Sequence, residues 1–332
     1  MEEGVRELLR LAAYPRGVAG IRSPEAERAI ERAALYLERS GGRAVPVQDR
    51  ACPAGLSSLA GGPRVVFLAG PWNHPGPLVA VVGARDASGD GCDVAYALAH
   101  SLAEQGVAVV SGLARGIDAA AHRGALEAGG QSGAVLGTGL ERAYPTEHRD
   151  LQNALARSLG LLSSLLPGSS PTPKTFASRN RILAAICDAV VVVQGRERSG
   201  ALLTATAARR LGRPLAALPW DSRDPLGAAP HALIRAGAAT LVRGAADVLE
   251  LLGVETRLGQ PDVPAAPREV AALGAREELL WSALRERPEA LEHAARRAKL
   301  TIAEASAAFV LLEILGRARR EPGGAVRRWT RR

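Results

Sequence analysis

The 332-residue sequence has few of the residues that build several common kinds of site. Its three cysteines, Cys52, Cys92 and Cys187, are scattered and odd in number. Because no C-x-x-C spacing occurs, they predict neither a disulfide framework nor a thiolate zinc site. We therefore expect a reducing compartment and no bound metal.

Long apolar runs are also missing. No stretch of about 18 apolar residues occurs, the length that a membrane-spanning helix needs. The first residues, MEEGVRELLRLAAYPRG, begin acidic and have no long uncharged core. We expect a soluble, cytoplasmic protein without a membrane partner.

Lysine is almost absent. Only Lys174 and Lys299 occur, so the formal charge of +8 and the pI near 10.2 come almost entirely from arginine. Guanidinium groups form paired bonds to phosphate and stack on bases, which favours a polyanionic partner. A compositional bias toward Ala and Arg would give the same charge, so charge alone leaves both explanations open.

What the sequence does contain is enough apolar material for a large core. Hydrophobic residues make up 47% of the chain, and its length predicts a main domain with appendages. Residues 1–62 carry apolar residues at helical spacing and predict a small helical appendage. Residues 63–253 form the predicted main domain.

Short apolar runs alternate with amphipathic segments through that main domain. Such alternation is typical of βαβ units and a parallel sheet. We predict an α/β fold, an extended Rossmann-like, doubly wound, mostly parallel sheet, whose ligand sites lie at the carboxyl ends of the strands. The predicted strands are residues 63–70, 78–83, 107–112, 132–137, 160–165, 189–195, 214–219 and 239–242.

The remaining residues predict a linker and a second domain. Residues 254–267 are rich in Pro and lack periodicity, which indicates a linker. Residues 268–332 predict three helices, the third over TIAEASAAFVLLEILGRARRE, and then a basic two-stranded wing closing on a Pro-Gly-Gly turn. That order is typical of a winged-helix domain.

The segment VVGARDASGDG, residues 81–91, is a glycine-bearing turn between a predicted strand and a predicted helix. Backbone N–H groups in such a turn can hold phosphate, and Arg85 could face an anion above the sheet or be a solvated loop charge. The glycine spacing is too long for the dinucleotide fingerprint, and Ser111-Gly112 end the next strand where an acidic ribose ligand would stand. We expect no NAD and no other cofactor.

The segment SGLARGIDAAAH, residues 111–122, combines glycines with polar groups. Gly112 and Gly116 allow close approach of a ligand, while Ser111 and Arg115 supply a hydroxyl and a charge. Asp118 and His122 share one helical face. We assign both a structural role, because no nucleophile accompanies them.

Two later segments add candidate nucleic-acid contacts. In PTPKTFASRNRILAAICD, residues 171–188, cations surround Phe176 in what we predict to be a polar loop. Single-stranded nucleic acid requires such interleaving, because cations neutralise phosphates while a ring stacks on a base. The alternative is that Phe176 caps the core. Ser199-Gly200 precede a predicted helix whose first amides could bind a further phosphate.

These motifs together resemble the DprA/Smf family (DNA-processing protein A). The resemblance spans about residues 63–253 and is carried, in the family order, by VAVVGAR, SGLARGIDAAAH, AVLGTGLERAYPTEHRDL, FASRNRILAA, SGALLTATAA and Gly237-Ala238. It implies an extended Rossmann-like fold that binds single-stranded DNA as a homodimer, loads RecA recombinase during natural transformation, and performs no catalysis. The C-terminal region resembles the winged helix of many members.

The resemblance also implies a DNA pocket. Its residues would be Arg85, Ser111, Gly112, Arg115, Gly116, Lys174, Phe176, Arg179, Asn180 and Arg181, to which the motif analysis adds Ser199 and Gly200. The sequence departs from the family pattern at Ser163-Ser164, Phe176-Ala177, Gln194 and Pro219-Trp220, and Cys52-Pro53 stand where Tyr-Pro is usual. Two pocket carboxylates are missing at Ser164 and Gln194, which makes acid–base catalysis less favourable and the ligand preference an open question.

Two alternatives stay open. A nucleotide-binding Rossmann-like enzyme of the phosphoribohydrolase type would use a glutamate in a P-G-G-x-G-T-x-x-E turn, and GRERSGALLTA has no carboxylate after its glycine. A transcription regulator would pair a ligand-sensing core with a winged helix that reads duplex DNA. The segment TIAEASAAFVLLEIL is acidic and apolar, which favours packing over base recognition.

Overall fold

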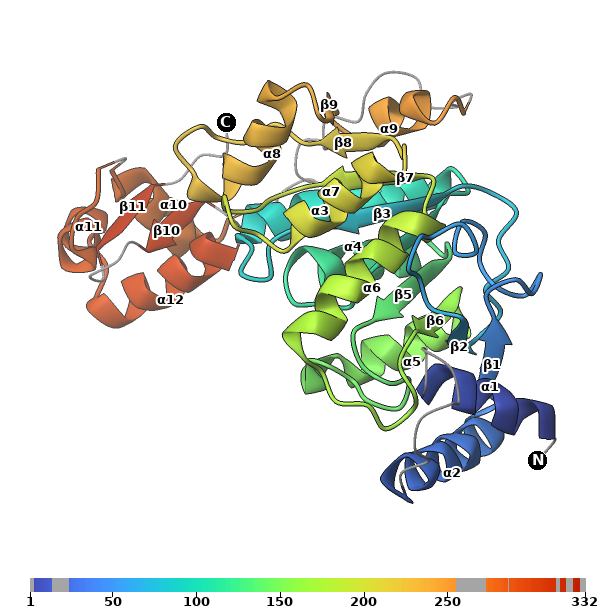
Figure 1. Cartoon of the computed structure of the whole chain (residues 1–332). Helices are drawn as coiled ribbons and strands as arrows, with labels where there is room; N and C mark the ends of the chain where they lie inside the picture. Colours follow the sequence, from blue (N-terminus) through green and yellow to red (C-terminus); the bar gives the residue numbers. More distant parts are fainter. Residues whose placement is uncertain are drawn as a thin grey trace. The chain divides into compact units, whose positions relative to one another are not determined.

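The computed structural model describes residues 3–13, 24–254, 273–285, 287–314, 317–320 and 325–328 (Figure 1). The chain divides into two compact units, residues 1–264 and 265–332, and each is described by itself. The predicted linker, residues 254–267, lies almost wholly outside the described residues. The domain boundaries derived from the sequence therefore stay predictions.

The first unit is built on a nine-stranded sheet in the order β1-β2-β6-β5-β4-β3-β7-β8-β9. The strands from β6 to β9 run parallel, while β1 and β2 add an antiparallel edge. Each predicted strand contains an observed one, so the doubly wound, mostly parallel sheet is confirmed. The bounds are β1 Arg43–Pro46, β2 Val65–Ala69, β3 Leu78–Val82, β4 Ala108–Ser111, β5 Ser132–Leu136, β6 Gly160–Ser163, β7 Ala189–Val192, β8 Leu215–Ala217 and β9 Thr240–Leu241.

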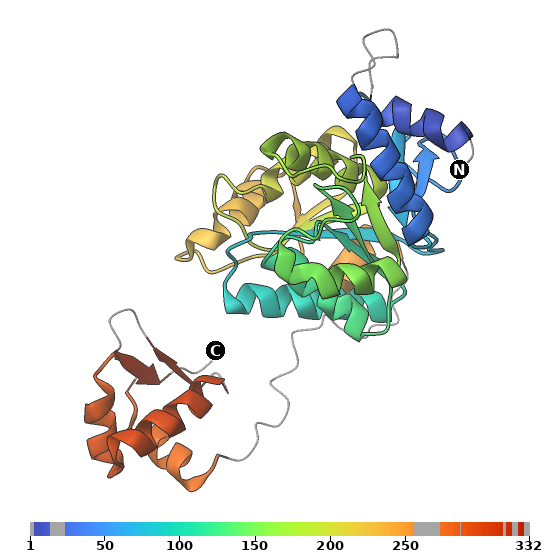
Figure 2. The same cartoon turned by 90° about the horizontal axis from the view of Figure 1, so that it is seen from below.

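Helices cover both faces of this sheet. Residues alternate along β3, so that Ala80 and Val82 pack on the face covered by α6 and α7 while Val79 and Val81 pack on the face covered by α3, α4 and α9 (Figures 1 and 2). The sheet is therefore buried on both faces. The helices are α3 Gly89–Glu104, α4 Ile117–Glu127, α5 Arg149–Arg157, α6 Pro173–Ile186, α7 Ala201–Arg210, α8 Ala228–Arg235 and α9 Ala245–Leu251.

The strand order changes direction between β3 and β7. From β3 the chain proceeds through β4, β5 and β6 toward one edge, and then crosses back to place β7 on the other side of β3. The loops that leave β3 and β7 consequently diverge at their carboxyl ends. Ligands bind at such a switch point in open α/β sheets.

The N-terminal segment contains two helices, α1 Glu3–Ala13 and α2 Pro24–Ser40, which lie side by side at the β1 edge of the sheet (Figure 2). The first turn of α2 carries Glu25 and Glu27 and its last turn carries Arg39, as the helix dipole favours. Residues 43–46 were predicted to belong to a helical appendage, which is wrong, because they form β1 and extend the sheet. A four-residue edge strand ending in Pro46 has too little apolar alternation to be predicted.

The second unit consists of α10 Ala275–Ala283, α11 Leu291–Ala298, α12 Ile302–Ile314 and a two-stranded sheet, β10 Ala318–Arg320 with β11 Val326–Arg328. Three helices followed by a wing confirm the winged-helix prediction. The third helix was predicted to extend through residue 321, which is wrong, because β10 occupies its last residues. The Pro-Gly-Gly turn lies outside the described residues.

Among the described residues, no helix is both long and apolar enough to cross a membrane. The same part of the chain contains no cluster of three or more His, Cys, Asp or Glu side chains arranged to hold a metal ion.

Candidate functional site

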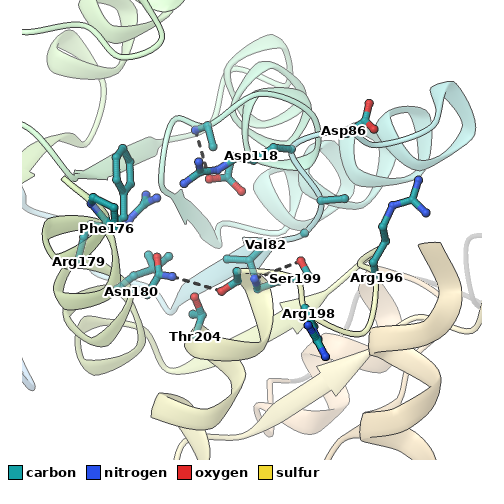
Figure 3. A pocket seen from close by; sticks show the side chains of 18 of the residues that line it. Val82, Asp86, Asp118, Phe176, Arg179, Asn180, Arg196, Arg198, Ser199 and Thr204 are labelled. Atoms are coloured by element: carbon teal, nitrogen blue, oxygen red, sulfur yellow. Dashed lines mark hydrogen bonds between the residues drawn. The ribbon is translucent and has the colours of Figure 1, made fainter. Parts of the chain in front are cut away.

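A cavity of about 740 Å³ opens at the switch point of the sheet (Figure 3). The turns after β3 and β7 line it, together with the first turns of α6 and α7. Figure 3 shows Phe176 and Arg179 on the α6 side of the cavity and Arg196 at its opposite end. Four arginines and two aspartates line the cavity, so it carries a net positive charge: Arg85, Arg179, Arg196, Arg198, Asp86 and Asp118.

Arg85 lies in the turn between β3 and α3. Its side chain is exposed, and the guanidinium carbon lies 4.8 Å from the centre of the Phe176 ring. Ser88 ends this turn as the N-cap of α3, where its side chain accepts the N–H of Gly91 at 3.0 Å. The turn therefore carries a guanidinium group above an aromatic ring beside the N-terminus of a helix.

The loop from Ser111 to Asp118 forms the floor of the site. The hydroxyl of Ser111 donates to the carbonyl of Val81 at 2.6 Å, and the N–H of Gly112 donates to the Asp118 carboxylate at 3.1 Å. Gly116 has a φ of +69°, and a Cβ there would lie 2.3 Å from the Ala84 carbonyl oxygen. Ser111, Gly112 and Gly116 thus shape the backbone below the cavity and are not among its lining residues.

Arg179 is a buried cation, only 4% exposed. Its Nη1 donates to the Val135 carbonyl at 3.0 Å, while its Nε has no hydrogen-bond partner among the described residues. Burial lowers the pKa of Arg179, and the facing Asp118 opposes that shift. A Cβ at Gly112 would lie 1.4 Å from Nη1, so only glycine leaves room for this guanidinium.

Asp118 is buried opposite Arg179. Burial raises the pKa of its carboxyl group, although the charge of Arg179 and the N–H groups of Ala114 and Gly112 oppose the shift. Its oxygen accepts two backbone N–H groups, as the structural role predicted for it requires. His122 is also buried and bonds to the Ser132 hydroxyl through Nδ1 at 2.8 Å.

Phe176 was predicted to lie in a polar loop, which is wrong. It belongs to α6, whose first turn is fixed by a reciprocal capping box between Thr172 and Thr175. The Phe176 ring contacts three partners: Arg85, Arg179 at 5.7 Å and Tyr144 at 5.5 Å between ring centres. Tyr144 is 46% exposed. An aromatic pair flanked by two guanidinium groups therefore borders the cavity.

The N-terminus of α7 meets the cavity from the other side. Ser199 and Gly200 line the cavity, and the Ser199 hydroxyl oxygen accepts the N–H of Ala201, the first residue of α7, at 3.3 Å. Asn180 of α6 donates its Nδ2 to the Gly200 carbonyl at 3.3 Å, which fixes the distance between the two helices. Because Ser199 and Gly200 already accept the N–H groups of the first three residues of α7, this end of the helix attracts an anion through the positive end of its dipole.

Arg115 is already paired. It forms a bidentate ion pair with Glu147, at 2.6 and 2.7 Å, which lowers the pKa of that exposed carboxylate. Arg115 lines a neighbouring cavity of about 430 Å³, which shares Arg85, Tyr144 and Phe176 with the first. The two cavities therefore meet at the aromatic pair.

Besides Ser111, Gly112 and Gly116, two further predicted residues lie apart from the cavity lining. Lys174 is exposed in the first turn of α6, next to the lining residues Thr172 and Pro173. Arg181 donates to the carbonyl of Ala60 at 2.5 Å and is outside both cavities.

Sequence reasoning also missed three residues. Arg196 and Arg198 are exposed, and their side chains make no hydrogen bond or ion pair among the described residues. They stand directly before Ser199-Gly200, so their position beside a helix start was the available signal. Tyr144 lies within a quoted family stretch but had no local pattern of its own.

Gln194 and Ser164, which stand where the family pattern has carboxylates, lie in different environments. Gln194 is completely buried, and Ser164 is partly buried after β6. Neither residue lines the cavities.

Comparison with known proteins places these features in a family. Residues 43–253 match the model of DNA recombination-mediator protein A, and residues 264–324 match the DprA winged helix domain. The chain belongs to the DNA recombination-mediator protein A family. The family match begins at Arg43, the first residue of β1, so the edge strand lies within the matched domain.

Individual members of the family are also similar to this chain in sequence or in structure. Protein Smf of Escherichia coli is 32% identical over 332 residues, covering 97% of this chain and 84% of that protein. The solved DNA processing protein A of Streptococcus pneumoniae is 34% identical with a TM-score of 0.61, over 73% of this chain and 86% of that one. The Helicobacter pylori protein, whose structure concerns its single-stranded DNA binding mode, is 25% identical with a TM-score of 0.57, over 64% and 95%.

Proposed function

We propose that the cavity at the switch point binds single-stranded DNA. The observation that carries the proposal is the position of two guanidinium groups, of Arg85 and Arg179, against the Phe176 ring at the edge of the cavity. Cations beside an aromatic surface bind phosphates and unstacked bases together. The exposed Arg196 and Arg198 offer further phosphate contacts beside the positive end of the α7 dipole.

A single strand fits this arrangement better than a duplex. Bases in a duplex have their faces covered by neighbours, so an aromatic side chain at the edge of a cavity cannot stack on them. The Tyr144–Phe176 pair lies where the two cavities meet, and Arg115 lines the second of them. We infer that the strand passes from one cavity to the other across this pair.

Family membership supports the biological setting. We propose that the chain acts in the cytoplasm during DNA uptake, natural transformation and recombination, as a homodimer that promotes loading of RecA recombinase onto the bound strand. We propose a binding role without catalysis, because the Asp118 carboxylate is occupied by backbone N–H groups and faces Arg179.

The test is fluorescence anisotropy of labelled oligo-dT and of an equally long duplex at two salt concentrations. We expect salt-sensitive preference for the single strand in the wild-type protein, weakened in Arg85→Ala. Arg157→Ala is the matched control, because Arg157 is an exposed arginine of α5 outside both cavities.

Equal affinity for the duplex, or full affinity in Arg85→Ala, would contradict the proposal. Either result would favour the alternative hypothesis, a transcription regulator that binds duplex DNA through its winged helix.

A further inference from the structure

Gln194 is a fully buried amide side chain beside the cavity, with no exposed surface. It follows β7 at the point where the strand order changes direction. Its backbone carbonyl accepts the N–H of Ala84 at 2.8 Å, so the β3–β7 pairing continues one step beyond the regular strands. Gln194 is thereby fixed against the first residue of the Arg85 turn.

The Gln194 side chain contacts the other end of the same turn. Its Oε1 accepts the N–H of Ser88 at 3.2 Å, and its Nε2 donates to the Ser88 hydroxyl oxygen at 2.8 Å. The Ser88 oxygen also accepts the Gly91 N–H as the N-cap of α3. A Cβ at Gly91 would lie 2.0 Å from Oε1, so the amide lies directly on the first turn of α3.

Arg85 lies between these two attachment points. Apart from its contact with the Phe176 ring, it makes no hydrogen bond or ion pair among the described residues. The backbone of residues 84–88 therefore determines where the guanidinium group lies.

We propose that Gln194 is a positioning residue for DNA binding, which fixes the turn of residues 84–88 and so holds Arg85 over Phe176. The inference rests on the proposed function of the cavity. A turn that is ordered before binding loses less conformational freedom when the strand arrives, which increases affinity without any contact between Gln194 and DNA.

A double-mutant cycle tests this inference, with anisotropy of labelled oligo-dT as the readout. Gln194→Met keeps the length of the side chain and removes both hydrogen bonds. We expect oligo-dT affinity to fall about fivefold in Gln194→Met, which corresponds to the typical net free-energy contribution of a single hydrogen bond. In the Arg85→Ala background the same change should alter affinity by less than about 1.5-fold, because its effect acts through Arg85.

Gln152→Met is the matched control. Gln152 is a buried glutamine whose Nε2 donates to the Leu140 carbonyl at 2.8 Å, and it lines neither cavity. We expect unchanged oligo-dT affinity in this variant. An equal loss of affinity for Gln194→Met with and without Arg85, or no loss at all, would overturn the inference.

Amide hydrogen exchange without DNA separates the two proposals. Gln194→Met should accelerate exchange of the Ser88 N–H about tenfold relative to wild type, while Gln152→Met leaves it unchanged. If wild-type protein fails to bind oligo-dT, the proposed function falls and the Ser88 exchange still decides the role of Gln194. Unchanged Ser88 exchange would overturn the positioning role even where DNA binding is intact.

Discussion

Arginines have different partners in the two units of the chain. In the winged helix, Arg328 donates to the Trp281 carbonyl at 2.6 Å and its guanidinium lies 4.5 Å from the Trp281 ring centre. Arg297 donates to the Ala283 carbonyl and pairs with Glu289. These arginines join one element of the winged helix to another.

At the cavity of the first unit, three of the four lining arginines are placed otherwise, whereas the buried Arg179 donates to the Val135 carbonyl. The side chains of Arg196 and Arg198 have no hydrogen-bond or ionic partner among the described residues, and the Arg85 guanidinium contacts only an aromatic ring there. The net charge of +8 therefore does not locate a binding site. Guanidinium groups without partners beside a cavity are better evidence for an anion-binding site than a high local count of arginine.

Arg179 should show the largest effect, because it is the one cavity arginine named above that is buried. Arg179→Met leaves Asp118 buried without its facing cation, and we expect the free energy of unfolding to fall by about 3 kcal/mol. Urea unfolding at pH 7 measures this. Arg85→Met, at an exposed position, should stay within about 0.5 kcal/mol of wild type.

Adding Asp118→Asn to Arg179→Met should restore part of the lost stability, since it removes the uncompensated charge. A loss below about 1 kcal/mol in Arg179→Met would show that the buried pair does not support the fold in this way.

Low pH should have the next largest effect, because it should lower the stability of the first unit through His122. Burial lowers the pKa of His122 in the first unit to about 3, whereas His293 in the winged helix is exposed. A lowered histidine pKa contributes stability that is present above about pH 6.5 and is lost as pH falls toward 3, because the unfolded chain then binds the extra proton. From pH 7 to pH 4, His122 alone should contribute a loss of about 3 kcal/mol to the stability of the first unit.

Hydrogen exchange of peptides from α4 and from α11 at several pH values follows the two units separately. His122→Asn should reduce the acid dependence of α4, since the amide keeps a donor for Ser132 without titrating. Identical acid dependence in wild type and His122→Asn would contradict the assignment.

A crossed pair of substitutions tests the comparison itself. Arg85→Ala should weaken oligo-dT binding about tenfold and reduce the salt slope by about 1, without changing stability. Arg328→Ala should destabilise the winged helix by about 1–2 kcal/mol through the lost bonds to Trp281, without changing oligo-dT affinity. Anisotropy and urea unfolding of both variants measure the four values. Loss of affinity in Arg328→Ala would break the comparison.

Tyr144 should give the smallest effect, because it is half exposed and tilted by 53° against Phe176. Tyr144→Ala should weaken oligo-dT binding about fivefold, at the lower end of what one stacked base contributes. Tyr144→Phe keeps the ring and should bind like wild type in the same anisotropy assay. A comparable loss in Tyr144→Phe would point to the hydroxyl instead of stacking.

The sequence predicts the main fold because parallel strands covered on both faces are continuous apolar runs, as at Val79–Val82. It does not predict β1, whose four residues depend on pairing with β2. The C-terminal end of α12 was overestimated for a related reason. Whether residues 318–320 continue a helix or begin a wing depends on their partner strand β11.

The candidate site was predicted where a residue follows a strand or starts a helix, as with Arg85 and Ser199. Arg181 was grouped with Arg179 because both are cations that follow Phe176 closely in the sequence and belong to the RNR triplet of the family resemblance. On the observed helix α6, residues two apart face different sides, and Arg181 points to Ala60. Tyr144 reaches the site from a distant segment, which only the folded chain brings beside Phe176.

Ultraviolet crosslinking tests the central claim most directly. Oligo-dT containing 5-bromodeoxyuridine would be irradiated with the full chain, and the crosslinked peptides identified by mass spectrometry. We predict crosslinks in the peptides that contain Tyr144 or Phe176, reduced in Arg85→Ala. Crosslinks confined to residues 273–328 of the winged helix would contradict the account, because the DNA would then lie on arginines to which we assign structural roles.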